Sequence, residues 1–315
     1  MVSVKKSHFK RILIIIITVL LVFSIVSLAA TKIIYDSIFA RFDCGGHTFG
    51  DEFTEIISTR QTVTYASGKN ELTGQLYKND NDRYDTLIVI APGFNACADS
   101  YLNQIKSLLG LGWSVFIFDV TGSGKSGGDS TVGFPQEIND LDSTLKYIEN
   151  NDRFGYNNIV LMGHSRGGYA VGCALGLGYD ISAAVTISGI NSAMEGVIGS
   201  AKRYVGPLAY GNYGFLWLYQ TMLFGAETTN MRAAEEISKS DVATLIIHGA
   251  DDRIVPIDKF SLYAHKDEIE NKNAVYHICR SPESDGHTDL LYDTDGSAND
   301  ELMEIINKFL LENIK

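Results

Sequence analysis

The stretch Ile159-Val-Leu-Met-Gly-His-Ser-Arg-Gly-Gly168 decides the fold of this chain. Its four leading apolar residues predict a short buried strand, and the following Gly163-His164-Ser165-Arg166-Gly167 fits the G-x-S-x-G pattern of a nucleophile turn. A serine in such a turn lies on a strained link between strand and helix, so Gly163 and Gly167 are needed where the two backbones approach. The apolar, Ala/Gly-rich run that follows predicts a helix packed under the sheet.

Strand and helix patterns alternate on both sides of this turn. Apolar or β-rich runs predict strands at 61–67, 72–77, 86–91, 114–119, 159–162, 183–188, 242–248 and 274–278. Helices are expected at 99–109, 135–149, 166–177, 258–266 and 299–311. An antiparallel start followed by repeated strand–helix units predicts an α/β fold with a mostly parallel, twisted sheet and helices on both faces.

A long segment, about 189–241, interrupts the alternation and is predicted to form a cap over the carboxyl edge of the sheet, where open α/β folds bind ligands. Its aromatic residues are Tyr204, Tyr210, Tyr213, Phe215, Trp217, Tyr219 and Phe224. Two interpretations remain open. The rings either form the apolar wall of a substrate pocket or simply pack in the core.

Length and charge limit the possible classes of protein. A chain of 315 residues with 45% hydrophobic content fits one large domain with additional segments. Residues 1–30 hold four Lys/Arg and no acid, so the rest of the chain has 22 basic residues against 38 acidic ones. This excess of negative charge argues against nucleic acid as a partner and against adhesion of the globular part to anionic lipid.

The N-terminus is predicted to cross a membrane. A basic tail, 1–11, precedes the uncharged run 12–30, whose nineteen residues would span about 28 Å as a helix. Because the basic cluster comes first, the tail is expected in the cytoplasm and the rest of the chain outside. A cleavable signal peptide, cut after Ser27-Leu28-Ala29, is the alternative, and it would also export the domain.

Residues 31–59 are weakly patterned and are expected to form a stalk or a helical excursion before the domain at 60–315.

The four cysteines include no C-x-x-C pair, so no zinc site is indicated. Cys173 and Cys279 are expected to be buried apolar groups. Cys44 and Cys97 could form a disulfide if the domain lies outside the cell.

A serine nucleophile needs a histidine base and a carboxylate that orients the base. In α/β folds with a nucleophile turn of this kind, the three residues follow one another along the chain in the order Ser, Asp, His. Asp251 and Asp252 follow the strand 242–248, and His287 lies in the loop after the last strand. Asp252 is preferred, because the carboxylate usually precedes the proline of such a loop by four residues and that proline is Pro256.

An oxyanion hole requires backbone N–H groups directed at the developing negative charge. One is expected from Arg166, which directly follows Ser165. The other is expected from Phe94 in the turn Ala91-Pro-Gly-Phe-Asn95 after the strand 86–91. Gly93 in this turn is expected to let the backbone approach the substrate closely.

Four motifs together resemble the α/β-hydrolase superfamily from about residue 60 to the end of the chain. They are Pro92-Gly-Phe-Asn95, Asp119-Val-Thr-Gly-Ser-Gly-Lys-Ser-Gly127, Gly163-His-Ser-Arg-Gly-Gly168 and Gly249-Ala-Asp-Asp-Arg-Ile-Val-Pro256. They are similar to the serine-aminopeptidase-like and monoacylglycerol-lipase-like branch. One departure is Pro92, because a histidine often precedes the oxyanion glycine in that branch, and the departure puts the support of this loop in question.

The sequence therefore predicts a membrane-anchored serine hydrolase, facing outward, that cleaves carboxylic esters through an acyl-enzyme and needs no metal or cofactor. Ser165 would attack, His287 would act as base and acid, and Asp252 would orient it. A peptidase or amidase of the same fold is the first alternative. A non-catalytic binding protein on a hydrolase fold is the second, since a fold alone does not guarantee activity.

Overall fold

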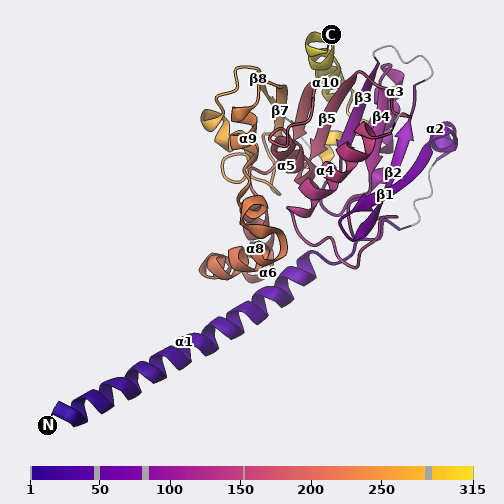
Figure 1. Cartoon of the computed structure of the whole chain (residues 1–315). Coiled ribbons are helices and arrows are strands. Elements are labelled where there is room, and N and C mark those ends of the chain that lie inside the picture. The colour runs from indigo at the N-terminus through magenta and orange to yellow at the C-terminus, as the bar shows by residue number, and fades with distance from the viewer. Residues whose placement is uncertain (1, 46–49, 80–84, 152, 281–285, 315) are drawn as a thin grey trace.

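In the computed structural model, the chain forms one eight-stranded sheet with helices on both faces and a long N-terminal helix that projects from the domain (Figure 1). The structure describes residues 2–45, 50–79, 85–151, 153–280 and 286–314. The strand order is β1-β2-β4-β3-β5-β6-β7-β8. The strands are β1 (Gln61–Ser67), β2 (Asn70–Tyr77), β3 (Thr86–Ala91), β4 (Ser114–Phe118), β5 (Asn158–His164), β6 (Ala183–Ile187), β7 (Ala243–Gly249) and β8 (Ala274–Cys279).

Strand β2 pairs antiparallel with β1 and β4, and the pairs from β4 through β3 and β5 to β8 are parallel. The carboxyl ends of the parallel strands therefore meet at one edge, which is where the nucleophile turn lies. The predicted α/β fold with a mostly parallel sheet is confirmed. All eight predicted strands are present, with ends that differ from the prediction by at most two residues.

Helices cover the sheet because successive strand residues point to opposite faces. Leu87 and Val89 of β3 belong to one apolar core and Ile88 and Ile90 to the other. The helices are α1 (Val2–Ile38), α2 (Thr54–Thr59), α3 (Leu102–Gly110), α4 (Gln136–Glu149), α5 (Arg166–Ala174), α6 (Ala193–Val205), α7 (Leu208–Gly211), α8 (Tyr213–Asn230), α9 (Ala233–Lys239) and α10 (Asp300–Asn313). Short 3₁₀ helices are η1 (Asp51–Phe53), η2 (Ala98–Tyr101), η3 (Leu262–Glu268) and η4 (Asp289–Leu291).

One helix prediction needs correction. The helix expected at 258–266 is instead the 3₁₀ helix η3, which starts only after Ser261, whose hydroxyl caps it by accepting from the Ala264 N–H at 2.9 Å. Ser261 itself is extended (φ −74°, ψ 151°) and forms a β-bridge with Ile190, so the turn at 257–260 does not continue into η3. Within the segment predicted to form a cap, α9 packs against α5, and the name cap is kept for α6, α7 and α8.

The apolar helix α1 is long enough to cross a membrane over His8–Ile38, and no residue of its most apolar 18-residue window is buried in the domain. Its C-terminal end is different, because Tyr35 and Phe39 are fully buried. The Phe39 ring packs 5.6 Å from that of Phe94 and 5.3 Å from that of Phe134. The start of the expected stalk is thus part of the core of the domain.

The residues after α1 are also fixed to the domain. The Arg41 guanidinium donates to the carbonyls of Gly124, Ser126 and Gly128 at 2.7–3.0 Å. Cys44 forms a disulfide with Cys97, which lies in the loop after β3. The described part of segment 31–59 therefore lies on the domain and does not extend away from it.

Candidate active site

Ser165 stands alone between β5 and α5 in a backbone conformation that side chains rarely adopt, with φ +57° and ψ −115°. Its N–H donates to the Ile187 carbonyl at 2.8 Å, which holds the turn against β6. Strain of this kind persists only where the surrounding structure enforces it. The turn directs the hydroxyl away from the strand and toward the loops at the carboxyl edge of the sheet.

The two glycines that flank the serine are needed for steric reasons. A Cβ on Gly163 would lie 2.2 Å from the Gly167 carbonyl oxygen, and one on Gly167 would lie 2.0 Å from the Ala91 oxygen. Both contacts are with backbone, so no side chain can move to relieve them. The G-x-S-x-G spacing is thus required by the approach of β5, α5 and β3.

Two loops bring an acid and a histidine to Ser165. Asp252 follows β7, and its Oδ2 accepts a hydrogen bond from His287 Nδ1 at 2.7 Å. His287 Nε2 lies 2.9 Å from Ser165 Oγ. All three residues are buried, whereas the neighbouring Asp251 is exposed. Ser284 and Asp285, which precede His287 in the predicted loop, lie outside the described residues.

The Asp252 carboxylate is held in its ionised form. Burial acts to raise its pKa, but hydrogen bonds from His248 and His287 and from the Val255 N–H outweigh burial and hold the pKa well below the usual range. Oδ1 accepts from the Ile254 and Val255 N–H groups at 2.8 and 2.7 Å. His248 Nε2 lies 3.3 Å from Oδ2.

Two backbone N–H groups beside Ser165 remain available for a ligand. Arg166 is the first residue of α5, so its N–H has no partner within the helix. The Phe94 N–H makes no hydrogen bond within the described part of the chain. Phe94 and Ser165 line the same cavity. This arrangement fits the expected oxyanion hole.

Support for the loop that contains Gly93 comes from Tyr101, which the sequence analysis did not identify. The Tyr101 hydroxyl accepts from the Gly93 N–H at 2.7 Å and donates to His164 Nδ1 at 3.1 Å. His164 Nε2 then donates to the His287 carbonyl at 3.2 Å. The question raised by Pro92 is thereby answered, because a tyrosine from η2 holds the loop.

His164 acts as a neutral bridge in this network. Burial, with a smaller contribution from His287, lowers its pKa to about 3, so the ring carries no charge at neutral pH. A Cβ on Gly93 would come 3.0 Å from His164 Nδ1 and 3.2 Å from the Tyr101 hydroxyl. The glycine is therefore needed to make room for these two side chains as well as for a substrate.

A buried ion pair lies beneath the turn. The Arg166 side chain contacts the Glu137 carboxylate of α4, and both side chains are almost completely buried. The Arg166 guanidinium also lies 5.6 Å from the centre of the Phe94 ring. Removal of Glu137 would leave an unpaired buried charge next to both expected oxyanion donors. The sequence showed only two distant charged residues and no sign that they meet.

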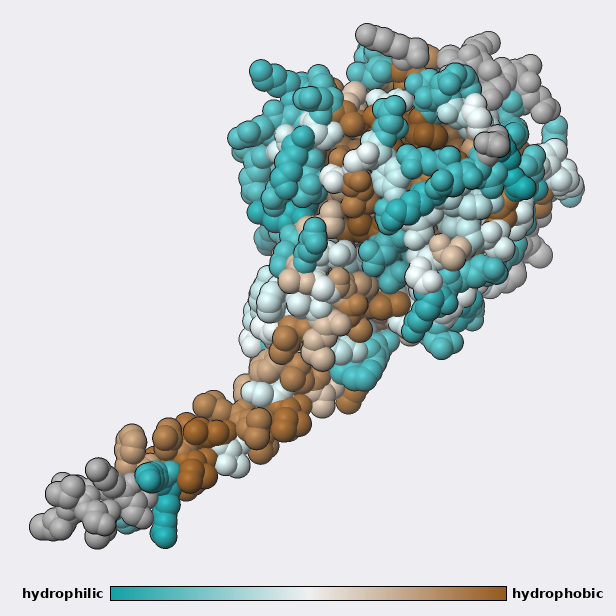
Figure 2. All heavy atoms as spheres, viewed as in Figure 1, coloured by the Kyte–Doolittle hydropathy of each residue, from teal (hydrophilic) through white to brown (hydrophobic). Residues whose placement is uncertain are grey.

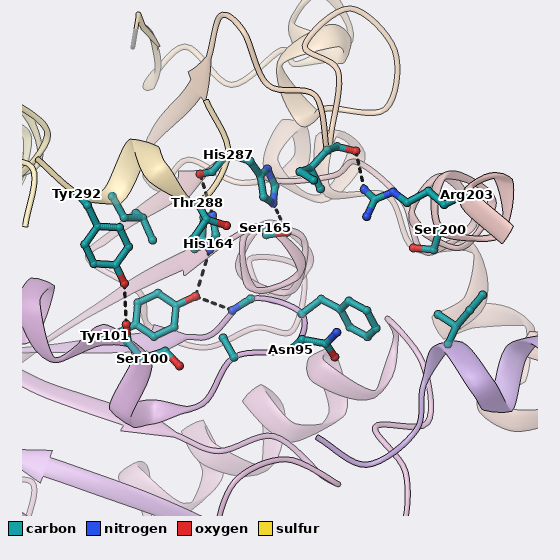
Figure 3. A pocket seen from close by; sticks show the side chains of 16 residues that line it. Asn95, Ser100, Tyr101, His164, Ser165, Ser200, Arg203, His287, Thr288 and Tyr292 are labelled. Atoms are coloured by element: carbon teal, nitrogen blue, oxygen red, sulfur yellow. Dashed lines mark hydrogen bonds between the residues drawn. The ribbon is translucent and has the colours of Figure 1, made fainter. Parts of the chain in front are cut away.

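A cavity of about 510 Å³ opens over Ser165 (Figure 3). Its apolar side includes Phe94, Leu291 and Ile38, the last residue of α1. Among the described side chains of the cap, Ser200 and Arg203 of α6 are the ones that line it. Arg203 donates to the Ile254 carbonyl at 3.3 Å, and it lies across the cavity from the loop that contains Asn95. Arg203 is the one Lys, Arg, Asp or Glu among the described lining residues.

The aromatic residues of the cap do not form the pocket wall that one interpretation expected. None of those whose side chains the structure describes lines the cavity at Ser165. Phe215 contacts Phe23 of α1, and Tyr219 contacts Tyr35. Tyr210 and Tyr213 line a separate cavity of about 340 Å³. The side chain of Tyr204 lies outside the described part.

Residues 82–198 match the family model described as serine aminopeptidase, S33. No curated protein matches the sequence. The chain is structurally similar to the esterase Pf2001 of Pyrococcus furiosus, with 19% identity, a TM-score of 0.65, and coverage of 88% of this chain and 99% of that one. It is also similar to Est1E from Butyrivibrio proteoclasticus with ferulic acid bound (20% identity, TM-score 0.59, 80% and 99% covered). A thermostable carboxyl esterase from Bacillus coagulans has 15% identity and a TM-score of 0.60 (81% and 99% covered).

Proposed function

We propose that the chain is a member of the α/β-hydrolase superfamily and that it is a serine hydrolase that cleaves carboxylic esters through an acyl-enzyme. The observation that carries this proposal is the hydrogen-bonded series Asp252, His287 and Ser165, with distances of 2.7 and 2.9 Å, beneath an open cavity. The esterases among its structural neighbours support the same class of reaction.

In the first half of the reaction, Ser165 Oγ attacks the ester carbonyl carbon while His287 Nε2 takes the hydroxyl proton. The ionised Asp252 fixes the tautomer with the proton on Nδ1 and stabilises the imidazolium. The carbonyl oxygen becomes an oxyanion bound by the Phe94 and Arg166 N–H groups. When the carbon–oxygen bond breaks, the leaving alkoxide takes the proton from His287, and the acyl group stays on Ser165.

In the second half, a water molecule replaces the alcohol. His287 takes a proton from the water, whose oxygen attacks the acyl carbon and forms a second oxyanion in the same site. Collapse of this intermediate returns the proton to Ser165 and releases the carboxylic acid. The cycle balances without a metal or another cofactor.

A fluorophosphonate probe and a short p-nitrophenyl ester test this proposal. Ser165→Ala should abolish labelling and reduce hydrolysis by roughly 10³-fold or more. Ser200→Ala, a serine that lines the same cavity, is the matched control and should keep both activities. Undiminished turnover by Ser165→Ala would refute the assignment. A folded wild-type chain that binds no probe would favour the non-catalytic alternative.

Peptidase or amidase activity is the second candidate, and two observations favour it. The matching family is that of serine aminopeptidases, and Glu195 lines a small cavity that adjoins Ser165. A substrate's amino terminus would need such a carboxylate, although Glu195 is already bound to His265 at 3.1 Å. Faster turnover of aminoacyl p-nitroanilides than of acyl esters, lost in Glu195→Gln, would decide for the peptidase.

We also propose that α1 is retained as a membrane anchor and that the domain faces the extracytoplasmic side. The basic residues before the apolar run support this orientation. The Cys44–Cys97 disulfide supports it as well, since such bonds persist in oxidising compartments. N-terminal sequencing of the protein purified from membranes tests whether α1 is retained. A mature terminus near Ala30 would favour the signal peptide.

A further inference from the structure

One stretch of the cap, residues 204–226, contains no Asp, Glu, Lys or Arg, although several of its side chains are exposed. Met222 exposes 71% of its surface and Leu208 exposes 78%. The large exposed hydrophobic side chains of this stretch are Leu208, Tyr210, Tyr213, Leu218, Met222 and Leu223. Exposed apolar patches of this kind mark contact with a membrane or with another protein.

The cap contacts α1 inside its apolar run. The Phe215 ring of α8 lies 6.1 Å from that of Phe23, and the Asn212 amide donates to the Thr31 hydroxyl at 2.5 Å. Ser24, Ser27 and Leu28 are half-buried in a helix whose other residues nearby are exposed. These three share one face because they are three and four residues apart. The contact therefore extends along the helix over more than one turn.

The position of this contact relative to a bilayer follows from the charges on α1. The apolar run begins after Arg11, and the next charged residue is Lys32. About 20 helical residues span a hydrocarbon core of about 30 Å, so the outer edge of that core lies near Thr31. Phe23 is eight residues earlier, about 12 Å deeper. A tilt of about 20° reduces this depth only to about 11 Å.

We infer that α8 lies beside α1 in the outer half of the lipid bilayer, with the exposed apolar side chains of the uncharged stretch 204–226 facing lipid. The basic residues before Ile12 prevent α1 from sliding outward to free Phe215 from the membrane. Figure 2 shows the hydrophobic surface of α1 continuing onto the adjoining part of the domain. The bilayer is therefore the partner that fits this surface, and a second copy of the chain or a soluble protein is not required.

The inference also places the catalytic cavity. Ile38 lines that cavity and is seven residues beyond Thr31, about 10 Å above the hydrocarbon edge. The mouth of the cavity accordingly lies at the level of the lipid headgroups. The position of α8 and this consequence both rest on the proposed retention of α1, and neither depends on catalysis.

The two tryptophans of the chain allow a direct test. Trp113 is buried and donates to Asn307 of α10, whereas Trp217 is on α8. Full-length Ser165→Ala protein, which cannot alter the lipids, is reconstituted in phosphatidylcholine vesicles with and without bromine on the acyl chains. Brominated lipid should reduce the tryptophan emission. The reduction should disappear in Trp217→Phe, because Trp113 remains distant from lipid.

Added probes make the test independent of Trp217. In the Trp217→Phe background, Met222→Trp should restore quenching. Val275→Trp, at an exposed position on β8, should not. Equal quenching at both positions, or none in the starting protein, would overturn the inference. Loss of the quenching when the protein is diluted in the vesicles would also overturn it, because the quenching would then depend on a second copy of the chain.

Flotation of the vesicles after an alkaline carbonate wash checks α1 separately. A chain that does not float lacks the anchor, and both the anchor and the position of α8 then fail. A chain that floats and shows the expected quenching, while its wild-type form hydrolyses no ester, would disprove the proposed activity and leave the lipid-facing surface established.

Discussion

The turn at Ser165 and the cap are held in place by opposite kinds of packing. At the turn, backbone meets backbone so closely that Cβ atoms on Gly163 and Gly167 would come within 2.2 Å of carbonyl oxygens. In the cap, Cβ atoms on Gly211 and Gly214 would meet nothing within 4 Å. The turn thus admits almost no variation, whereas the cap can change its residues freely where it faces lipid or solvent.

The largest effect on kcat is expected at Asp252, the acid that accepts a hydrogen bond from His287. Asp252→Asn keeps the shape of the side chain but lets His287 adopt the wrong tautomer, so kcat for a p-nitrophenyl ester should fall roughly 10³- to 10⁴-fold. Asp251→Asn is the matched control on the exposed neighbour and should change kcat little. Equal losses in the two variants would show that Asp252 does not orient the base.

The packing contrast is tested by one substitution in each region. Gly167→Ala forces a backbone shift and should lower the free energy of unfolding by about 3 kcal/mol or more. Gly214→Ala, in helix α8, should change it by less than about 1 kcal/mol, in the stabilising direction, because alanine favours helix. Thermal unfolding in detergent measures both. Similar losses would contradict the contrast.

Loss of the hydrogen bond that supports the loop at Gly93 should have a smaller effect, and one confined to kcat. Tyr101→Phe removes the acceptor of the Gly93 N–H and loosens the oxyanion loop. We expect kcat to fall about tenfold, which corresponds to about 1.4 kcal/mol, with KM nearly unchanged. Tyr292→Phe is the control, because its hydroxyl donates to the Ser100 carbonyl at the edge of the cavity and makes no hydrogen bond to the loop at Gly93 within the described part of the chain. A rise in KM alone would assign Tyr101 to substrate binding.

The last effects concern the pH dependence of stability, and they have opposite signs in the two regions. Burial lowers the pKa of His164 to about 3, so the unfolded chain binds the extra proton first and stability falls as the pH drops below about 6.5. This one group contributes a slope of about 1.4 kcal/mol per pH unit. His164→Gln should flatten the acid side of the stability curve.

At the cap, hydrogen bonding to Glu195 of α6, with a smaller contribution from Glu268, raises the pKa of His265. The protonated ring joins α6 to η3, so its contribution is complete below about pH 6.5 and is lost as the pH rises through the raised pKa. His265→Gln should therefore flatten the alkaline side of the same curve. Unfolding midpoints from pH 4 to 9 measure both variants, and a change on the acid side for His265→Gln would contradict this assignment.

Several features of the molecule were predictable because their causes are local. The alternation of apolar runs predicted all eight strands, and the glycines around Ser165 predicted a turn whose steric demands act over five residues. The order of Ser165, Asp252 and His287 along the chain predicted which loops would meet, because the carboxyl ends of parallel strands share one edge. The apolar run before Thr31 likewise indicated a helix of membrane-spanning length by composition alone.

Only the tertiary structure decided which distant segments face one another. It placed Phe39 beneath Phe94, joined Cys44 to Cys97, and provided Tyr101 as the support for the loop at Gly93. It also turned the aromatic residues of the cap toward α1 and away from Ser165. No local pattern encodes these contacts, because their free energy comes from burial and hydrogen bonding between residues that are brought together only when the whole chain folds.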